Sequence, residues 1–252
     1  MGWRHWLDLV VPRACAACAE PSDGPLCDRC RAALPWIPTY LRCALCQGEL
    51  ERPGASSGVM RCAKCTAQPS PLLRCTAAVW LEGDVHAWIR RFKYPRRGLA
   101  GLDAQAGAVA RDLARAAARR GALLRPDCVI PIPLHPSRLR SRGFNPAGLL
   151  ASVIARDAGV GVRHDCLVRV RDTPRQTGMG RRARSENVAG AFAWQARQPV
   201  SPHRVWLVDD VVTTGATLRA AAEVLRGAGV REVFALCAAR SPERGGGVES
   251  AL

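Results

Sequence analysis

Two adjacent carboxylates, Asp209 and Asp210, follow a short apolar run at residues 205–208. An unbroken run that contains β-branched residues is typical of a strand buried on both faces of a parallel sheet. The acid pair is therefore expected at the carboxyl end of that strand, where open α/β sheets bind their ligands. Carboxylates in such a place can accept hydrogen bonds from sugar hydroxyls or ligate Mg²⁺, so the pair predicts a site for a diol, a magnesium ion or both.

A loop of five small residues comes soon after the acid pair, and a helical run follows it at residues 218–226. The loop consists of Thr213, Thr214, Gly215, Ala216 and Thr217. Backbone N–H groups of such a loop, together with the positive end of the helix dipole, favour a phosphate group, and threonine hydroxyls add further donors. A phosphate loop beside a diol site indicates a sugar-phosphate ligand. The alternative is an ordinary buried strand followed by a helix that Thr217 caps.

Two other phosphate-binding folds fit this sequence poorly. A P-loop ATPase needs Gly-x4-Gly-Lys-Ser/Thr, which does not occur, and the only lysines are Lys64 and Lys93. A dinucleotide-binding fold needs Gly-x-Gly-x-x-Gly after its first strand, and no such run qualifies.

Four Cys-x2-Cys pairs lie within residues 15–65, and two such pairs supply the four thiolates of a closed tetrahedral zinc site. The eight predicted ligands are Cys15, Cys18, Cys27, Cys30, Cys43, Cys46, Cys62 and Cys65. We expect two structural Zn²⁺ ions, with pair one joined to pair two and pair three to pair four; a cross-braced arrangement stays open. The other four cysteines, Cys75, Cys128, Cys166 and Cys237, lie in apolar runs and are expected to be buried thiols.

The chain of 252 residues carries a net charge of +16, from 37 basic and 21 acidic residues. Such a balance favours polyanionic partners such as nucleic acid. No apolar stretch reaches the length of a membrane span, and residues 1–11 have the spacing of a docked amphipathic helix. Paired cysteines without an export signal indicate metal thiolates in a reducing cytoplasm.

Basic side chains gather at the end of a second predicted strand, residues 127–133. His135, Arg138, Arg140 and Arg142 follow it, then Asn145 as a helix cap. With Lys93, which precedes a Tyr-Pro-Arg-Arg run, they supply the positive charge that a pyrophosphate group requires. The polar residues 171–187 are expected to form a mobile loop over the site. Exposed basic loops without a ligand are the alternative.

The order of these motifs resembles the ComF family of competence-associated proteins. The matching segments are the four cysteine pairs, Phe-Lys-Tyr, Ile-Pro-Ile-Pro-Leu-His-Pro-x-Arg-x-Arg-x-Arg-Gly-Phe-Asn, Thr-Pro-x-Gln and Val-Asp-Asp-Val-Val-Thr-Thr-Gly-Ala-Thr. The last run resembles the 5-phosphoribosyl-1-pyrophosphate (PRPP) motif of type I phosphoribosyltransferases. The resemblance implies an α/β fold of that type, with a parallel sheet flanked by helices, over residues 71–240. A double zinc ribbon would precede it at residues 1–70, and residues 241–252 would be a flexible tail.

The resemblance also implies a role for each site residue. Asp209 and Asp210 would bind the ribose diol of PRPP, which brings Mg²⁺, and residues 213–217 would bind its 5-phosphate. Lys93, His135, Arg138 and Arg142 would face the pyrophosphate, beneath a flexible loop at residues 171–187. One departure is Pro146, where relatives commonly carry Gln.

Three functions follow as hypotheses from the resemblance and the charge. The first is a PRPP-binding protein that handles single-stranded DNA during DNA uptake in natural transformation. The second is an active phosphoribosyltransferase in which Asp209 and Asp210 hold the ribose while an amine or nucleobase acceptor attacks. The third is an adaptor whose zinc ribbons dock a helicase-like competence protein.

Overall fold

The computed structural model describes residues 14–50, 60–67, 69–95, 100–121, 124–173, 188–195 and 203–242. Three predicted segments lie outside these residues: the amphipathic helix at 1–11, most of the mobile loop at 171–187, and all but two residues of the tail at 241–252.

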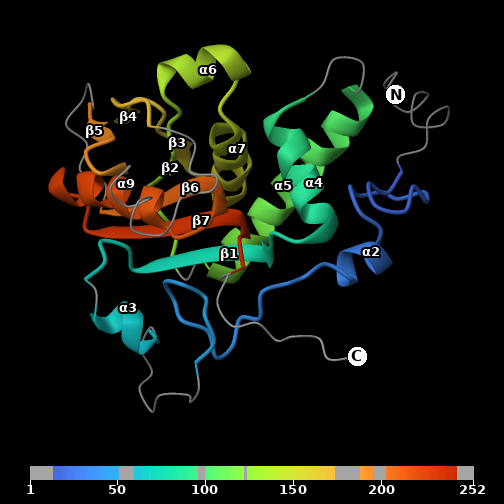
Figure 1. Ribbon diagram of the computed structural model, residues 1–252, viewed down its shortest axis with the longest axis horizontal. Coiled ribbons are helices and arrows are strands. Elements are labelled where there is room, and N and C mark those ends of the chain that lie inside the picture. Colours follow the sequence, from blue (N-terminus) through green and yellow to red (C-terminus); the bar gives the residue numbers. More distant parts are fainter. Residues whose placement is uncertain are drawn as a thin grey trace.

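A five-stranded parallel sheet forms the centre of the molecule (Figure 1). Its strands are β1 (Arg74–Trp80), β2 (Cys128–Pro131), β3 (Gly161–Val162), β6 (Arg204–Val212) and β7 (Glu232–Arg240), in the order β1-β7-β6-β2-β3. Every neighbouring pair is parallel. The two segments predicted as strands, residues 127–133 and 205–208, lie in β2 and β6, and the α/β class with a parallel sheet is confirmed.

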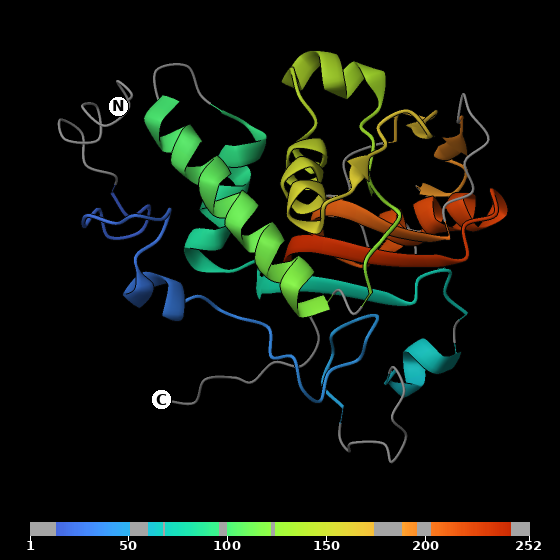
Figure 2. The same cartoon turned by 180° about the vertical axis from the view of Figure 1, so that it is seen from behind.

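Helices cover both faces of the sheet, as Figures 1 and 2 show from opposite sides. One face packs against α4 (Gly83–Lys93), α5 (Ala100–Gly121) and α7 (Pro146–Ala158), and the other against α9 (Ala216–Gly227). Successive residues of β6 alternate between the two cores: Trp206 and Val208 belong to the first, whereas Val205 and Leu207 belong to the second. Both faces of β6 are thus apolar because both are covered.

The chain changes direction in the sheet between β2 and β6. From β2 it passes through α7 to β3 at one edge, whereas from β6 it passes through α9 to β7 on the other side. The two connections leave the carboxyl ends of β2 and β6 in opposite directions, and open α/β sheets bind their ligands at such a point. We refer to the region between these two strand ends as the crevice. The topology therefore predicts a ligand site at these two strand ends.

Two small elements lie close to that crevice. The short helix α6 (Pro136–Arg142) follows β2 and ends at Gly143, whose φ of 83° is in the left-handed region that glycine adopts most easily. An antiparallel pair, β4 (Leu167–Arg169) with β5 (Phe192–Trp194), contacts α9. Asn145 caps α7 by accepting from the Ala147 N–H at 3.1 Å, as predicted.

The cysteine-rich segment, which includes the short helices α2 (Asp28–Ala32) and α3 (Ala63–Ala67), runs along the outer edge of β1 (Figure 2). Backbone hydrogen bonds join it to that strand, from Ile37 N to Ala78 O and from Cys75 N to Ala44 O. The Gln47 side chain pairs with both backbone groups of Ala77, at 2.8 and 3.1 Å. The otherwise unpaired edge of β1 is therefore covered.

Within the described ranges, no helix is both long enough and apolar enough to cross a membrane.

Candidate phosphosugar site and metal centres

The acid pair lies at the crevice between β2 and β6. β2 ends at Pro131, opposite Val208, so Asp209 and Asp210 extend past the end of that neighbouring strand. The prediction placed the end of the strand at Val208, but β6 continues to Val212 because β7 pairs with it as far as Arg240. Asp210 is 7% exposed, and its backbone N–H donates to Asp209 Oδ1 at 2.8 Å.

Lys93 meets the acid pair directly, although the two lie 116 positions or more apart in the sequence. It is the last residue of α4, and its Nζ lies 2.9 Å from Asp210 Oδ1. Burial acts to lower the pKa of Lys93, but the Asp210 carboxylate outweighs it and the pKa is raised. The lysine predicted to face pyrophosphate is thus at the site, as a cation paired with the acid that should hold the ribose.

Asp209 is a carboxyl group with an unusual proton affinity. Its partial burial and the neighbouring charge of Asp210 raise its pKa to about 7, and the charges of Lys93 and Arg169 only partly offset this. A carboxyl group that is half ionised near neutral pH gains from any partner that stabilises its ionised form. Sugar hydroxyls and Mg²⁺ are partners of that kind.

The predicted phosphate loop occupies the turn between β6 and α9. Gly215 has a φ of 75° and is the N-cap of α9, so the alternative in which Thr217 caps this helix is wrong. A side chain at position 215 would be strained at this φ and would lie 3.2 Å from the Arg219 guanidinium. That guanidinium donates to Thr214 O at 3.0 Å and steadies the loop. Thr213, Thr214 and Gly215 thus connect β6 to α9, and Ala216 and Thr217 belong to the first turn of that helix.

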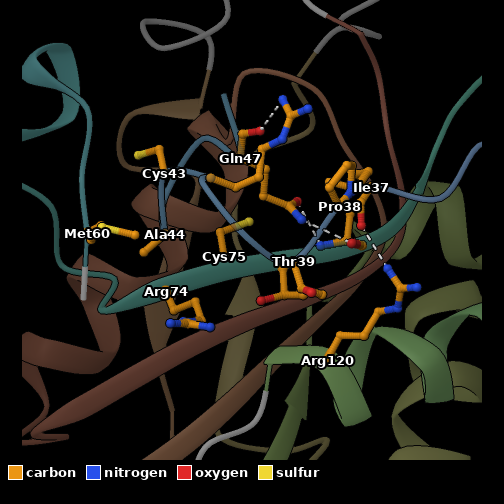
Figure 3. Close-up of a pocket in the computed structure, with 13 residues that line it drawn as sticks. Ile37, Pro38, Thr39, Cys43, Ala44, Gln47, Met60, Arg74, Cys75 and Arg120 are labelled. Atoms are coloured by element: carbon orange, nitrogen blue, oxygen red, sulfur yellow. Dashed lines mark hydrogen bonds between the residues drawn. The ribbon is translucent and has the colours of Figure 1, made fainter. Parts of the chain in front are cut away.

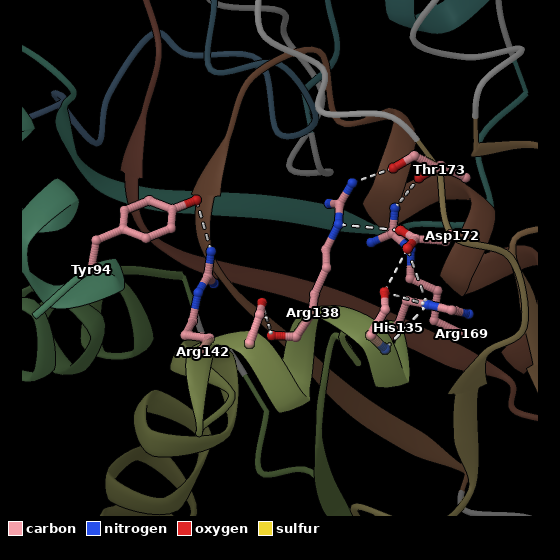
Figure 4. Close-up of polar contacts among 9 residues, drawn as sticks. Tyr94, His135, Arg138, Arg142, Arg169, Asp172 and Thr173 are labelled. Atoms are coloured by element: carbon pink, nitrogen blue, oxygen red, sulfur yellow. Dashed lines mark hydrogen bonds and ion pairs between the residues drawn. The ribbon is translucent and has the colours of Figure 1, made fainter.

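Three of the four basic residues in the α6 region, which follows β2, bind protein groups (Figure 4). His135 caps α6 by accepting from Ser137 N. Arg138 donates to Thr173 O and lies 3.4 Å from Asp172. Arg142 donates to the Tyr94 hydroxyl at 2.9 Å, with its guanidinium 4.7 Å from the centre of that ring. Tyr94 follows Lys93, so this contact links α6 to α4.

Arg169, the last residue of β4, was missed by sequence reasoning. It is 9% exposed, donates to Thr173 Oγ1, and lies 5.5 Å from the Phe192 ring centre, while its Nε has no hydrogen-bond partner. Burial lowers the pKa of Arg169, and its charge in turn lowers the pKa of Asp209. The signal was present: Arg169 shares a strand face with buried Leu167, and an arginine on an apolar face requires an anionic partner.

Asp172 contacts Ser137 and Arg138 of α6 and the His135 side chain that caps this helix. Its carboxylate accepts from Ser137 Oγ and lies 3.4 Å from both His135 Nδ1 and Arg138 Nε (Figure 4). The Ser137 hydrogen bond and the charge of Arg138 hold the pKa of Asp172 below its usual value. An anionic ligand must compete with this carboxylate for Arg138.

Replacing Asp172 with asparagine is therefore expected to strengthen pyrophosphate binding about three- to tenfold, because an exposed competing charge is removed. Calorimetric titration with pyrophosphate measures this. Asp165→Asn is the matched control, since Asp165 is also exposed but pairs with Arg163 at 3.2 Å. Equal gains in both variants would mean that only net charge matters.

The eight paired cysteines form two groups. The first cysteine cluster consists of Cys15, Cys18, Cys27 and Cys30, and the second cysteine cluster of Cys43, Cys46, Cys62 and Cys65. All sulfur atoms of a cluster lie within 4.8 Å of one another. The Sγ atoms of Cys18 and Cys27 are 3.8 Å apart, and those of Cys46 and Cys62 are 3.7 Å apart. A tetrahedron with Zn–S bonds of ~2.3 Å has edges of roughly 3.8 Å, so both groups can hold a zinc ion.

This grouping is the sequential pairing that we expected, and the cross-braced alternative is wrong. Cys75, Cys128, Cys166 and Cys237 are buried, also as predicted.

A family model described as phosphoribosyl transferase domain matches residues 107–249. The chain is 30% identical to DNA utilization protein YhgH of Salmonella typhi, over 91% of this chain and 98% of the relative. It is 37% identical to Competence protein F of Haemophilus influenzae, over 47% of this chain and 52% of that protein.

Among solved structures, the glutamine PRPP amidotransferase of B. subtilis is 17% identical, with a TM-score of 0.41, over 66% of this chain and 32% of that one. Orotate phosphoribosyltransferase of Aeropyrum pernix is 21% identical, with a TM-score of 0.32, over 56% and 75% of the two chains.

Proposed function

The chain belongs to the ComF family and carries a phosphoribosyl transferase domain, and from this premise we propose that the crevice between β2 and β6 binds PRPP with Mg²⁺. One observation carries the proposal. The acid pair and the small-residue loop, which each predict half of a sugar-phosphate site, meet at the point where the chain reverses its direction in the sheet.

Each group in the crevice has a role in this proposal. Asp209 and Asp210 hold the ribose hydroxyls, and residues 213–217 bind the 5-phosphate through backbone N–H groups at the start of α9. Lys93, His135, Arg138 and Arg142 surround the pyrophosphate. Mg²⁺, bound with PRPP, neutralises part of its charge. Lys93 leaves Asp210 when the ligand arrives, since one ammonium group cannot serve both partners fully.

The same geometry suits transfer of the phosphoribosyl group, which is the second candidate function. When pyrophosphate departs, negative charge accumulates at the leaving group and positive charge on the ribose. Arginines on α6 stabilise the former, and the acid pair on β6 stabilises the latter. An amine or a nucleobase is the acceptor that this reading requires.

Titration calorimetry with PRPP and Mg²⁺ tests the site. We expect binding to the wild type, and at least about a hundredfold weaker binding to the Asp209→Asn/Asp210→Asn double variant, because two charged acceptors are lost. Asp157→Asn, which removes an exposed carboxylate paired with Arg115, is the control. Indistinguishable titrations for the wild type and the double variant would reject the assignment.

We also propose that the protein handles single-stranded DNA. Two relatives are named for DNA utilization and competence, and a net charge of +16 favours a polyanion. The acid pair does not contribute to this attraction. Salt-sensitive binding of an oligothymidine should therefore survive in the double variant that has lost PRPP.

Two structural Zn²⁺ ions in the cysteine clusters complete the proposal, and a boundary near residue 70 separates them from the PRPP-binding part. Because thiolate clusters require a reducing compartment, we place the protein in the cytoplasm. If the protein were instead an adaptor whose cysteine clusters dock a helicase-like partner, it would bind neither PRPP nor single-stranded DNA.

A further inference from the structure

A pocket of about 130 Å³ lies where the second cysteine cluster meets the edge strand β1 (Figure 3). Its walls come from residues 37–47 with Met60, from residues 74–77 of β1, and from Arg120 near the end of α5. It is placed beside the amino-terminal half of β1, whereas the acid pair lies toward the carboxyl end of β6. The pocket is therefore separate from the crevice described above.

The wall of this pocket carries positive charge without a matching acid. Arg42, Arg74 and Arg120 line it, and no aspartate or glutamate does so among the described residues. None of the three forms an ion pair with a carboxylate in the described part of the chain. Arg31, which pairs with Asp112, shows the usual arrangement elsewhere in the molecule. Uncompensated positive charge in a concave, partly desolvated wall attracts anions.

Arg74 has a specific unmet requirement. Its Nε is buried and has no hydrogen-bond partner, which is costly for a charged group unless a ligand supplies an acceptor. The neighbouring side chain on the same strand face, Thr76, is 8% exposed and also lines the pocket. A bound oxyanion would satisfy the guanidinium and could accept from the hydroxyl.

Arg120 is already fixed in position. Its guanidinium donates to Ile37 O at 2.7 Å and lies over the Trp36 ring, 4.6 Å from the ring centre (Figure 3 shows the contact with Ile37). Burial lowers the pKa of Arg120, and no carboxylate offsets that effect. An arginine held in this way loses little conformational freedom when it binds an anion.

We propose that this pocket binds a phosphate group, held by Arg74 and Arg120 with Arg42. A cavity volume of roughly 15 Å³ holds one water molecule, so a cavity of about 130 Å³ admits a small oxyanion. Guanidinium groups match the oxygen geometry of phosphate with paired hydrogen bonds. The proposal does not depend on PRPP binding at the crevice, because the two sites share no residue.

Hydrogen exchange of the zinc-loaded full chain, with and without inorganic phosphate, locates the site. We expect phosphate to slow exchange at residues 37–47 and 74–77. When the phosphate concentration is varied in this experiment, the protection of these residues gives the affinity of the site for phosphate. We expect that affinity to be at least about tenfold weaker in Arg74→Gln and in Arg120→Gln. Arg115→Gln, on the same helix but paired with exposed Asp157, should bind as the wild type does.

Protection confined to residues 213–217 would overturn the proposal, since it would place all phosphate in the crevice. Unchanged affinity in both arginine variants would overturn it as well. Arg120→Lys keeps the charge and loses the paired donors, so it serves if a glutamine variant fails to fold or to hold two zinc ions. It too should bind phosphate more weakly than the wild type.

The source of the phosphate is a second arm of the experiment. An oligothymidine without terminal phosphates should displace inorganic phosphate if the pocket receives a nucleic-acid backbone. If it does not compete, the ligand is a free phosphate or a monoester. Either result is compatible with the pocket as a phosphate site.

Discussion

Replacing Cys43 with serine is expected to lower the zinc content from two ions to one and to unfold the segment that covers β1. Cys43 is 1% exposed and belongs to the second cysteine cluster. Structural zinc contributes about 10 to 16 kcal/mol to the folding of zinc-finger peptides, and this segment has few apolar residues that could replace it. Metal analysis and hydrogen exchange across residues 42–50 and β1 measure the two effects.

Cys166→Ala is the matched control, because Cys166 is equally buried but lies outside both clusters. It should retain two zinc ions and the wild-type exchange pattern along β1. If Cys43→Ser also kept two ions and a protected β1 edge, the second cluster would not be a metal site.

Loss of the second zinc ion should also destabilise the parallel sheet, because a buried hydrogen-bond network joins the second cysteine cluster to β1 and β7. Gln47, in the cluster segment, accepts from both the Ala77 N–H and Arg240 Nε through its Oε1. Arg240, at the end of β7, is 4% exposed and also donates to Leu45 O. When the cluster unfolds, these buried donors lose their acceptors, which costs free energy beyond the metal itself.

The features that sequence predicted well are those with a local signal. The spacing of the apolar residues, together with the turn residues, predicted the positions of β6, the Gly215 loop and the Asn145 cap. Each prediction lies within a few residues of the structure. The Cys-x2-Cys spacing gave both metal groups, because each pair is formed by one short turn. The acid pair was found because an abrupt change from apolar to acidic residues marks a strand end.

What sequence could not supply are contacts between distant segments. The ion pair between Lys93 and Asp210 depends on where α4 ends relative to β6, which only the packing of α4 and α5 on the sheet determines. Likewise, the length of β6 beyond Val208 depends on its pairing with β7. Arg169 was missed because no motif marks it, and its one signal in the sequence is its place on the apolar face of a short strand.

Asp209 should lower the stability of the protein at neutral and alkaline pH, so that Asp209→Asn is the more stable protein there. The folded pKa of about 7 lies well above the usual value of 3.8. Between pH 4 and 7 the folded state therefore keeps a proton that the unfolded state has released, and the free energy of unfolding falls as pH rises. Above pH 7 both states are ionised, and the penalty stays constant at up to about 4 kcal/mol.

Asparagine avoids this penalty, because its side chain is neutral at every pH and keeps an oxygen that accepts from the Asp210 N–H. We expect equal melting temperatures for the variant and the wild type near pH 4, and a variant that melts about 5 to 15 °C higher at pH 8. Thermal unfolding scans from pH 4 to pH 8 measure the difference in melting temperature between the variant and the wild type. Asp157→Asn, at an exposed ion pair, should show only a small difference at pH 8.

A wild type as stable as Asp209→Asn at pH 8 would show that this carboxylate is well solvated or fully paired in the free protein. The expected result instead ties the site to its ligand. A carboxylate that its surroundings make costly to ionise is stabilised once ribose hydroxyls or Mg²⁺ approach it. PRPP with Mg²⁺ should therefore raise the melting temperature of the wild type at pH 8 and leave that of Asp209→Asn unchanged.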